Sequence, residues 1–241
     1  MPGYAFFDLD GTLLPGDTQM LFAQQVIRRE PRRRWHLALV AFGLPLVPLV
    51  GARGLKRLYF SFLWKLPAHR IWDLVDEFVE ELIPRHCFAE MLREIDRHRY
   101  EGRTLILNTA SPGLYAEAIA RKLEFDECVS TPMRLRDPMP LLPEIEGPNN
   151  KRAAKLPPMK AFLPTGFDPA DPQALPDSWA YTDSANDLPL LRCAENRVVV
   201  HPSEKLAALA EAEGWEIKRP DFPSGYQEGK LARVEQMLGL S

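Results

Sequence analysis

Short apolar stretches alternate with amphipathic helical patterns along most of this chain. This alternation predicts a parallel sheet that is covered by helices on both faces. We therefore expect an α/β fold with a Rossmann-like parallel sheet core. The stretch 132–176 is rich in proline and is interpreted as loops between core elements. The expected strands are residues 4–9, 104–108, 127–130, 179–182 and 197–200.

Two of the expected helices have clear boundary signals. After the second strand, Ser111 is a good N-cap residue, and Pro112 suits the first helical position. Apolar residues then recur every four positions, as on one face of a helix. Near the end of the chain, Ser203 and Gly214 are expected to begin and end a helix at 204–213.

The segment between the first two strands is far longer than a crossover connection needs. It has helical periodicity and no convincing strand, so we interpret it as an inserted α-helical cap domain. The predicted division places the core at residues 1–14 and 100–218 and the cap at 15–99. Residues 219–241 are expected to form a polar tail with one short helix.

Composition and charge narrow the class of protein. With 241 residues, 46% of them hydrophobic, the chain can bury a sizeable core. A formal net charge of -3 and the absence of a nucleic-acid-binding motif mean that nucleic acid is not an expected partner. The three cysteines are far apart in the sequence, and the N-terminus lacks a signal-peptide pattern. We expect reduced thiols and a cytoplasmic location.

The most informative chemistry follows the first expected strand, where Asp8 and Asp10 are one residue apart. Side chains alternate along a strand, so both carboxylates start on one face, and Gly11 allows the backbone to turn beneath them. Two like charges this close need a cation or a proton. Mg²⁺ prefers carboxylate oxygens and keeps positions open for phosphate and water, so the pattern favours phosphoryl transfer.

In such a site the two aspartates would have different roles. Asp8 is the candidate nucleophile, which would form an aspartyl-phosphate. Asp10 could protonate the leaving alkoxide and then deprotonate the attacking water, and its backbone carbonyl could face the metal.

Other residues at expected strand ends are also candidates. Thr109, after the second strand, could bind phosphate oxygens, although Thr109 and Ser111 are equally suited to capping a helix. Asp183, after a later strand, could complete the Mg²⁺ shell. Asp187 could support the metal site or orient a lysine, although a helix cap is the alternative interpretation.

A lysine near the nucleophile would offset the negative charge of carboxylates and phosphate. Lys151, Lys155 and Lys160 are all candidates, and each alone has the ordinary interpretation of a solvated surface charge.

Taken in order, these motifs resemble those of the haloacid dehalogenase superfamily. The shared features are D-x-D-G-T, a hydroxyl after the second strand, a lysine, and D-S-x-N-D. The Thr109-Ala110-Ser111-Pro112 turn and the helical insertion look like the phosphoserine phosphatase branch. The resemblance covers roughly residues 4–13 and 100–215.

The resemblance implies a role for each matching residue. Asp8 would be the nucleophile, Asp10 the acid and base, and Thr109 and Lys155 the phosphate-binding residues. The metal ligands would be Asp8, Asp10 and Asp183, supported by Asn186 and Asp187. The implied activity is Mg²⁺-dependent hydrolysis of a small phosphorylated metabolite.

The cap is expected to select the substrate, because the core handles only the phosphoryl group. Asp17 could meet a substrate amine, as an acidic residue nearby does in phosphoserine phosphatases, or could simply cap a helix. Arg53 and Arg57 are candidates for binding a substrate carboxylate. The pattern selects neither a particular metabolite nor an oligomeric state.

A basic run at 28–34 followed by the apolar stretch 37–50 suggests peripheral membrane contact through the cap. A membrane span is not expected, because prolines interrupt a stretch shorter than the roughly 20 residues needed. A solvated turn followed by a buried helix, and a dimer interface, are the alternatives.

Other functions remain as alternatives to hydrolysis. They are a phosphotransferase with the same intermediate and a membrane-surface docking protein. A signalling receiver is disfavoured, because it carries its phosphoacceptor after the third strand.

Overall fold

A six-stranded parallel sheet forms the core of the computed structural model. The structure describes residues 3–43, 47–147, 150, 152–169, 173–224 and 226. The strand order is β3-β2-β1-β6-β7-β8, so the first strand of the sequence lies inside the sheet. This confirms the predicted α/β class. The strands are β1 (Tyr4–Phe7), β2 (Thr104–Pro112), β3 (Glu127–Thr131), β6 (Leu175–Thr182), β7 (Ala194–Val200) and β8 (Glu216–Lys218).

The apolar character of β1 explains its interior position. Phe6 and Phe7 are fully buried, and they belong to different hydrophobic clusters because side chains alternate across a strand. Phe6 packs in the cluster that contains Leu190, and Phe7 packs in the cluster that contains Tyr115. The core therefore has one apolar layer on each side of the sheet.

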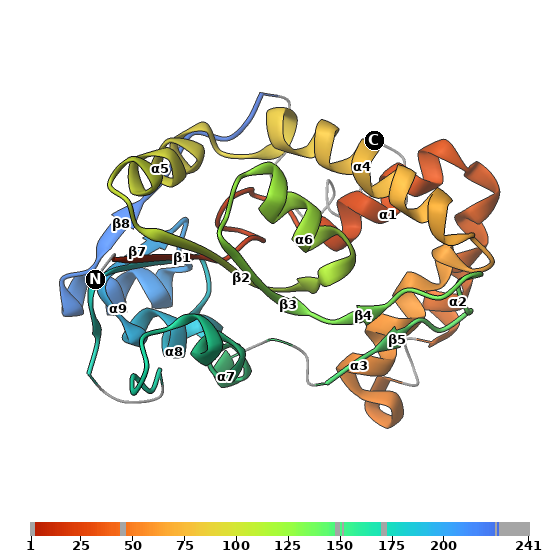
Figure 1. Cartoon of the computed structure of the whole chain (residues 1–241). Helices are drawn as coiled ribbons and strands as arrows, with labels where there is room; N and C mark the ends of the chain where they lie inside the picture. Colours follow the sequence, from red (N-terminus) through yellow and green to blue (C-terminus); the bar gives the residue numbers. More distant parts are fainter. Residues whose placement is uncertain are drawn as a thin grey trace.

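Helices cover both faces of this sheet (Figure 1). α5 and α6 lie on the face that carries Phe7, whereas α7, α8 and α9 lie on the face that carries Phe6. Gly214, with a φ of +69°, ends α9 as predicted. The helices are α5 (Ala89–Tyr100), α6 (Gly113–Lys122), α7 (Leu156–Met159), α8 (Leu188–Cys193) and α9 (Glu204–Glu213).

The helices that follow β1 gather beyond one end of the sheet, at the right of Figure 1. This arrangement agrees with an inserted helical cap. α5 instead packs against the sheet, where His98 Nε2 lies 2.8 Å from the Tyr181 hydroxyl. The predicted boundary between cap and core at residue 99 stays a prediction. Because of this packing, we propose that α5 belongs to the core. The other helices are α1 (Thr18–Arg29), α2 (Trp35–Gly43), α3 (Val47–Tyr59) and α4 (Ala68–His86).

The stretch 132–176 contains more structure than the predicted loops. β4 (Met133–Arg134) and β5 (Glu144–Ile145) form an antiparallel pair that extends from the end of β3 toward α3. The interpretation of 132–176 as loops between core elements was therefore wrong for this pair of strands. Strands of two residues are too short to show an alternating pattern.

The structure also corrects the start of α6. β2 continues beyond residue 108 to Pro112, which is the N-cap residue of α6. Ser111 therefore lies in the strand, and its hydroxyl donates to Asp10, so its prediction as a helix cap was wrong. Ser203 occupies the predicted N-cap position of α9, but its hydroxyl caps none of the N–H groups that the structure describes.

In the basic run at 28–34, Arg28 and Arg29 end α1, and residues 31–34 form a short 3₁₀ helix. Arg33 donates to the backbone carbonyls of Phe62 and Trp64 at 2.8 and 2.9 Å, whereas Arg32 and Arg34 are exposed. In the apolar stretch 37–50, residues 44–46 and the side chains of 47–50 lie outside the described part. No helix within the described residues is both long and apolar enough to cross a membrane.

The chain after β8 returns to the junction between core and cap. The Phe222 ring stacks on His201 and on Tyr226, with centroids 4.7 and 4.9 Å apart, and contacts Phe88 at 5.8 Å. The Tyr226 hydroxyl donates to the Pro15 carbonyl at 3.2 Å. Since Pro15 precedes α1 and Phe88 follows α4, this C-terminal segment touches both connections to the cap. The predicted short helix of the tail lies outside the described residues.

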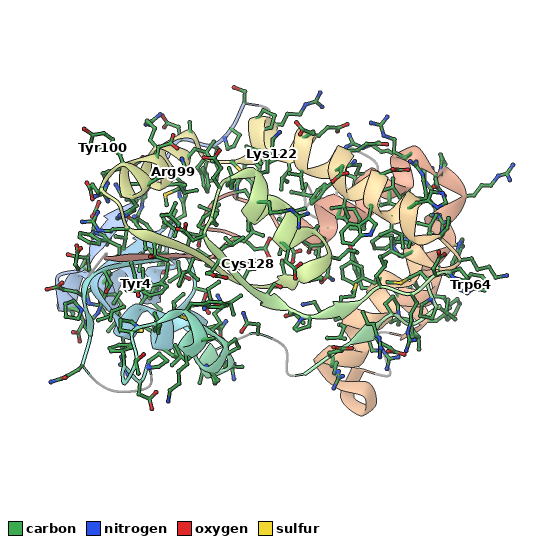
Figure 2. The ribbon with its side chains drawn as sticks, in the orientation of Figure 1. Tyr4, Trp64, Arg99, Tyr100, Lys122 and Cys128 are labelled. Carbon is green, nitrogen blue, oxygen red and sulfur yellow. The ribbon has the colours of Figure 1, made fainter. Side chains whose placement is uncertain are left out.

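We expect Phe222→Ala to loosen this junction. The Phe88 amide, which donates to the Leu13 carbonyl at 2.8 Å, should exchange its hydrogen roughly 2- to 10-fold faster, because an aromatic contact is worth about 0.5–1.5 kcal/mol. Trp64→Ala is the control, because Trp64 is similarly exposed but lies in the cap, at the far right of Figure 2. Equal protection of Phe88 in both variants would contradict the contact.

Candidate active site

The ends of β1 and β6 place two of the predicted carboxylates close together. Asp8 follows β1, and its N–H donates to the Tyr181 carbonyl at 3.0 Å, which continues the pairing with β6. Asp183 follows β6 and lies against the turn at Gly11. Gly11 has a φ of +80°, and a methyl group there would overlap the Asp183 carboxylate. The turn therefore requires glycine at this position.

Lys155 is the lysine beside the candidate nucleophile. Its Nζ donates to Asp8 Oδ1 at 2.8 Å and to Asp187 Oδ2 at 2.6 Å, and its side chain is only 2% exposed. The Thr182 hydroxyl also donates to Asp187, at 3.0 Å. Burial lowers the pKa of Lys155, but Asp8 and Asp187 more than offset this, so the pKa is raised and the ammonium form is retained.

The carboxylates around Lys155 carry more negative charge than one ammonium group offsets. The pKa of Asp8 is raised to about 7, chiefly by burial and also by the Asp187 and Asp183 carboxylates, against the lowering influence of Lys155. Burial also raises the pKa of Asp183 to about 6, and the Asp187 carboxylate contributes. This excess of negative charge is the electrostatic setting in which a divalent cation binds favourably.

Donors from two directions hold the Asp10 side chain. The Thr18 N–H, at the start of α1, donates to Oδ1 at 2.7 Å, and the Ser111 hydroxyl donates to Oδ2 at 2.6 Å. The Thr18 and Ser111 hydroxyls lie 2.9 Å apart, and the Tyr115 hydroxyl lies 3.4 Å from Ser111 Oγ. Thr18, Ser111 and Tyr115 are buried. Residues of both cap and core therefore fix the orientation of Asp10.

The phosphate-binding candidate Thr109 is buried in the last part of β2. Its Oγ1 accepts the Ser111 N–H at 3.0 Å, and Thr109 is 1% exposed. The Asn150 side-chain amide donates to the Thr109 carbonyl at 2.7 Å and to Asn108 Oδ1 at 3.1 Å. The sequence interpretation gave Asn150 no role, although it lies in the polar segment that contains the candidate lysines.

A cap residue also contacts this part of β2. Lys56, on α3, donates from Nζ to the Ala110 carbonyl at 2.6 Å. Sequence reasoning missed Lys56, because nothing in a helical pattern shows which loop a side chain will reach. Arg53 and Arg57 are close by on α3, but they donate to backbone carbonyls of the β4–β5 hairpin.

The oxygen-rich donor set fits a hard cation. Within the described residues, no three Asp, Glu, His or Cys side chains form a metal-binding group. Asp8 and Asp183 supply two carboxylates, and the Asp10 backbone carbonyl remains a candidate ligand, whereas the Asp10 side chain is engaged by Thr18 and Ser111. Mg²⁺ is commonly held by one or two carboxylates and completes its shell with phosphate and water.

The remaining predicted residues have simpler surroundings. Asp17 caps α1, since Oδ1 accepts the N–H groups of Gln19 and Met20 at 2.8 and 3.3 Å, which confirms the capping alternative. Asn186 is exposed and accepts a hydrogen bond from Arg152 Nε at 3.2 Å. Lys160 is 60% exposed. Lys151 lies outside the described residues.

A parallel sheet with an acidic site at its carboxyl edge and an inserted helical cap is the architecture of a haloacid dehalogenase-like hydrolase. Residues 5–192 match the model of this family, so the chain belongs to it. Its fold is that of the phosphoserine phosphatase-like branch.

Individual relatives are distant. The chain is 27% identical over 225 residues to the "Inhibition of morphological differentiation protein" of Streptomyces azureus, covering 88% of this chain and 76% of the relative. It is 25% identical over 247 residues to phosphoserine phosphatase SerB1 of Mycobacterium tuberculosis, covering 98% and 74%.

Solved structures share the fold. A Bordetella pertussis Tohama I protein of unknown function has a TM-score of 0.73 at 24% identity, covering 91% of this chain and 99% of that one. A substrate-bound phosphoserine phosphatase has a TM-score of 0.60 at 16% identity, covering 92% and 95%.

Removal of the buried ammonium should be costly for folding. Lys155→Met leaves Asp8 and Asp187 buried without their cation, and we expect a loss of about 3–5 kcal/mol in the free energy of unfolding. Urea unfolding measures this, with Lys160→Met as the exposed control, which should change by no more than about 0.5 kcal/mol. Equal stabilities of the two variants would contradict the ion-pair geometry.

Proposed function

We propose that the chain is a Mg²⁺-dependent phosphatase that hydrolyses a small phosphomonoester through an aspartyl-phosphate on Asp8. The observation that carries this proposal is the Lys155 ammonium group, which lies 2.8 Å from Asp8 and 2.6 Å from Asp187 in a buried site. Membership of the haloacid dehalogenase-like hydrolase family supports the same class of reaction.

The first step forms a bond between an Asp8 oxygen and phosphorus, and the bond from phosphorus to the ester oxygen breaks. Asp10 gives a proton to the departing alkoxide. A bound Mg²⁺, held by Asp8, Asp183 and the Asp10 carbonyl, would neutralise charge on the phosphoryl group. Lys155 and the hydroxyl of Thr109 would bind its oxygens.

The second step regenerates the site. Asp10, now ionised, takes a proton from water as the water oxygen attacks phosphorus, and the bond to Asp8 breaks to release phosphate. Both steps need Asp10 at a fixed position, and the hydrogen bonds from Thr18 and Ser111 support this role. Asp187 would act indirectly, by holding Lys155.

The substrate is proposed to be a small phosphorylated molecule, as the names of relatives such as phosphoserine phosphatase SerB1 suggest. A substrate-bound phosphoserine phosphatase with the same fold supports the same class of ligand. The cytoplasmic location stays a prediction.

The direct test is phosphate release from a panel of phosphomonoesters with Mg²⁺ or with EDTA. We expect EDTA to abolish release, and Asp8→Asn to reduce it to background, because the amide is not a competent nucleophile. Asp73→Asn, an exposed change of the same chemistry on α4, should keep full activity. Release that survives Asp8→Asn would contradict the proposal. Transfer to an added alcohol instead of water would identify a phosphotransferase.

A second variant tests the positioning of Asp10. Ser111→Ala removes the hydroxyl that donates to Asp10, and we expect kcat to fall by roughly 10-fold with little change in KM, a fraction of the ~10²–10⁴ that general acid-base catalysis supplies. Steady-state kinetics measures this, with Ser203→Ala as the control. An unchanged kcat in Ser111→Ala would show that the bond does not position Asp10.

A further inference from the structure

The cap contains an apolar cavity that the proposed reaction does not use. It has a volume of about 800 Å³ and lies between α2, α3 and the loop that joins β4 to β5. Its lining includes Leu39, Phe42, Leu58 and Leu142, with Arg53 and Arg57. A cavity of this size is within the range of about 300–1,000 Å³ that is typical of small-molecule sites.

This lining leaves apolar surface uncovered. Phe42 is 81% exposed and Leu142 is 41% exposed, although both side chains would be more stable out of water. The polar side chains in the lining are Arg53 and Arg57, and both already bind the hairpin. Arg57 donates to the Pro143 and Leu142 carbonyls at 2.9 and 3.1 Å. The cavity is therefore built by contacts that keep α3 and the hairpin together.

α3 and β3, the strand that leads into the hairpin, both contact the end of β2 where phosphate is proposed to bind. From α3, Lys56 donates to the Ala110 carbonyl at 2.6 Å, and from the end of β3 that leads into the hairpin, Thr131 donates to the same carbonyl at 2.7 Å. Lys56 and Arg53 are three positions apart on α3, so their Cβ atoms are about 5–6 Å apart. One turn of helix therefore links the cavity wall to the end of β2 that is proposed to bind phosphate.

Charge along this route is positive. Arg53 and Arg57 line the cavity, and Lys56 extends from the same helix to the Ala110 carbonyl, which suits a ligand whose anionic head is continuous with an apolar chain. A small polar ester would leave the apolar lining without a partner.

We propose that this cavity binds the apolar chain of the substrate, so that the site acts on amphiphilic phosphomonoesters. The phosphate would lie at Asp8 and Thr109, the ester linkage beside Lys56, and the chain between α2, α3 and the hairpin loop. This inference rests on the proposed phosphatase function and specifies its substrate class.

A chain-length series of alkyl phosphates tests the inference. Ethyl, butyl, hexyl and octyl phosphate are compared as monomers, below their micelle-forming concentrations. Each fully buried methylene is worth about a fourfold gain in binding, so kcat/KM should rise at least about 100-fold from ethyl to octyl even with partial burial. A flat series, with ethyl phosphate hydrolysed, would overturn the subsite and leave the phosphatase intact.

Adjacent leucines of the hairpin loop provide a matched pair of variants. Leu142 lines the cavity and Leu141 does not, and they are 41% and 38% exposed. Leu142→Glu places a carboxylate in the cavity and should reduce the octyl-to-ethyl ratio to below about 10-fold, because a charge opposes chain burial. Leu141→Glu should retain the full ratio. Equal loss in both variants would contradict the assignment.

A binding measurement tests the subsite independently of catalysis. Titration calorimetry of the Asp8→Asn protein compares octylphosphonate with methylphosphonate, neither of which has an ester bond to hydrolyse. Tighter binding of octylphosphonate that Leu142→Glu abolishes would support the subsite even if no ester is hydrolysed, in which case only the proposed function fails. If instead both leucine variants lose only co-sedimentation with anionic vesicles, the patch is a membrane-docking surface and the subsite is wrong.

Discussion

The arrangement of the site depends on one buried ammonium group. An unpaired cation in the protein interior is strongly disfavoured, so Lys155 can be buried only where carboxylates meet it. Asp8, after β1, and Asp187, after β6, provide them, while the Asn108 side chain donates to the Lys155 carbonyl at 3.2 Å from β2. The ends of β1 and β6, the middle of β2 and the connection before α7 are therefore held in one geometry. The same contacts that satisfy Lys155 in folding place it beside the carboxylate proposed to attack phosphorus.

Part of the fold and of the site could be predicted from the sequence, because neighbouring residues encode those features. The apolar run of β1 and the spacing of Asp8 and Asp10 reflect strand periodicity and turn chemistry, which neighbouring residues encode. Ser111 shows the limit, since its preference for helix N-caps was overridden by the Asp10 carboxylate from a distant part of the chain. Asn150 and Lys56 were missed for the same reason, because their partners are determined by tertiary packing. β8 and the β4–β5 hairpin were too short to give a pattern.

The core holds the proposed chemistry and the cap covers it, and two of the contacts between them reach the site directly. Thr18, the first residue of α1, donates its N–H to Asp10, and Lys56 of α3 donates to Ala110. A movement of the cap would therefore change the surroundings of the proposed acid and base and of the phosphate-binding end of β2 together. Closing of a cap over a substrate is a common way to exclude water from a reaction. In this protein, closing of the cap would also determine whether Asp10 keeps its hydrogen bond from the Thr18 N–H.

The contacts of the C-terminal segment imply an order in which parts of the molecule can assemble during synthesis. Phe222 and Tyr226 are among the last residues described, yet they contact Phe88 and Pro15, where the chain leaves and enters the cap. A ribosome makes the first core strand, then the cap, then the rest of the sheet, and domains generally begin to fold during synthesis. The cap can thus assemble early, but its two connections acquire their aromatic cover only after every strand of the sheet has been made. A nascent chain with a complete sheet would still lack the aromatic contacts at these two connections.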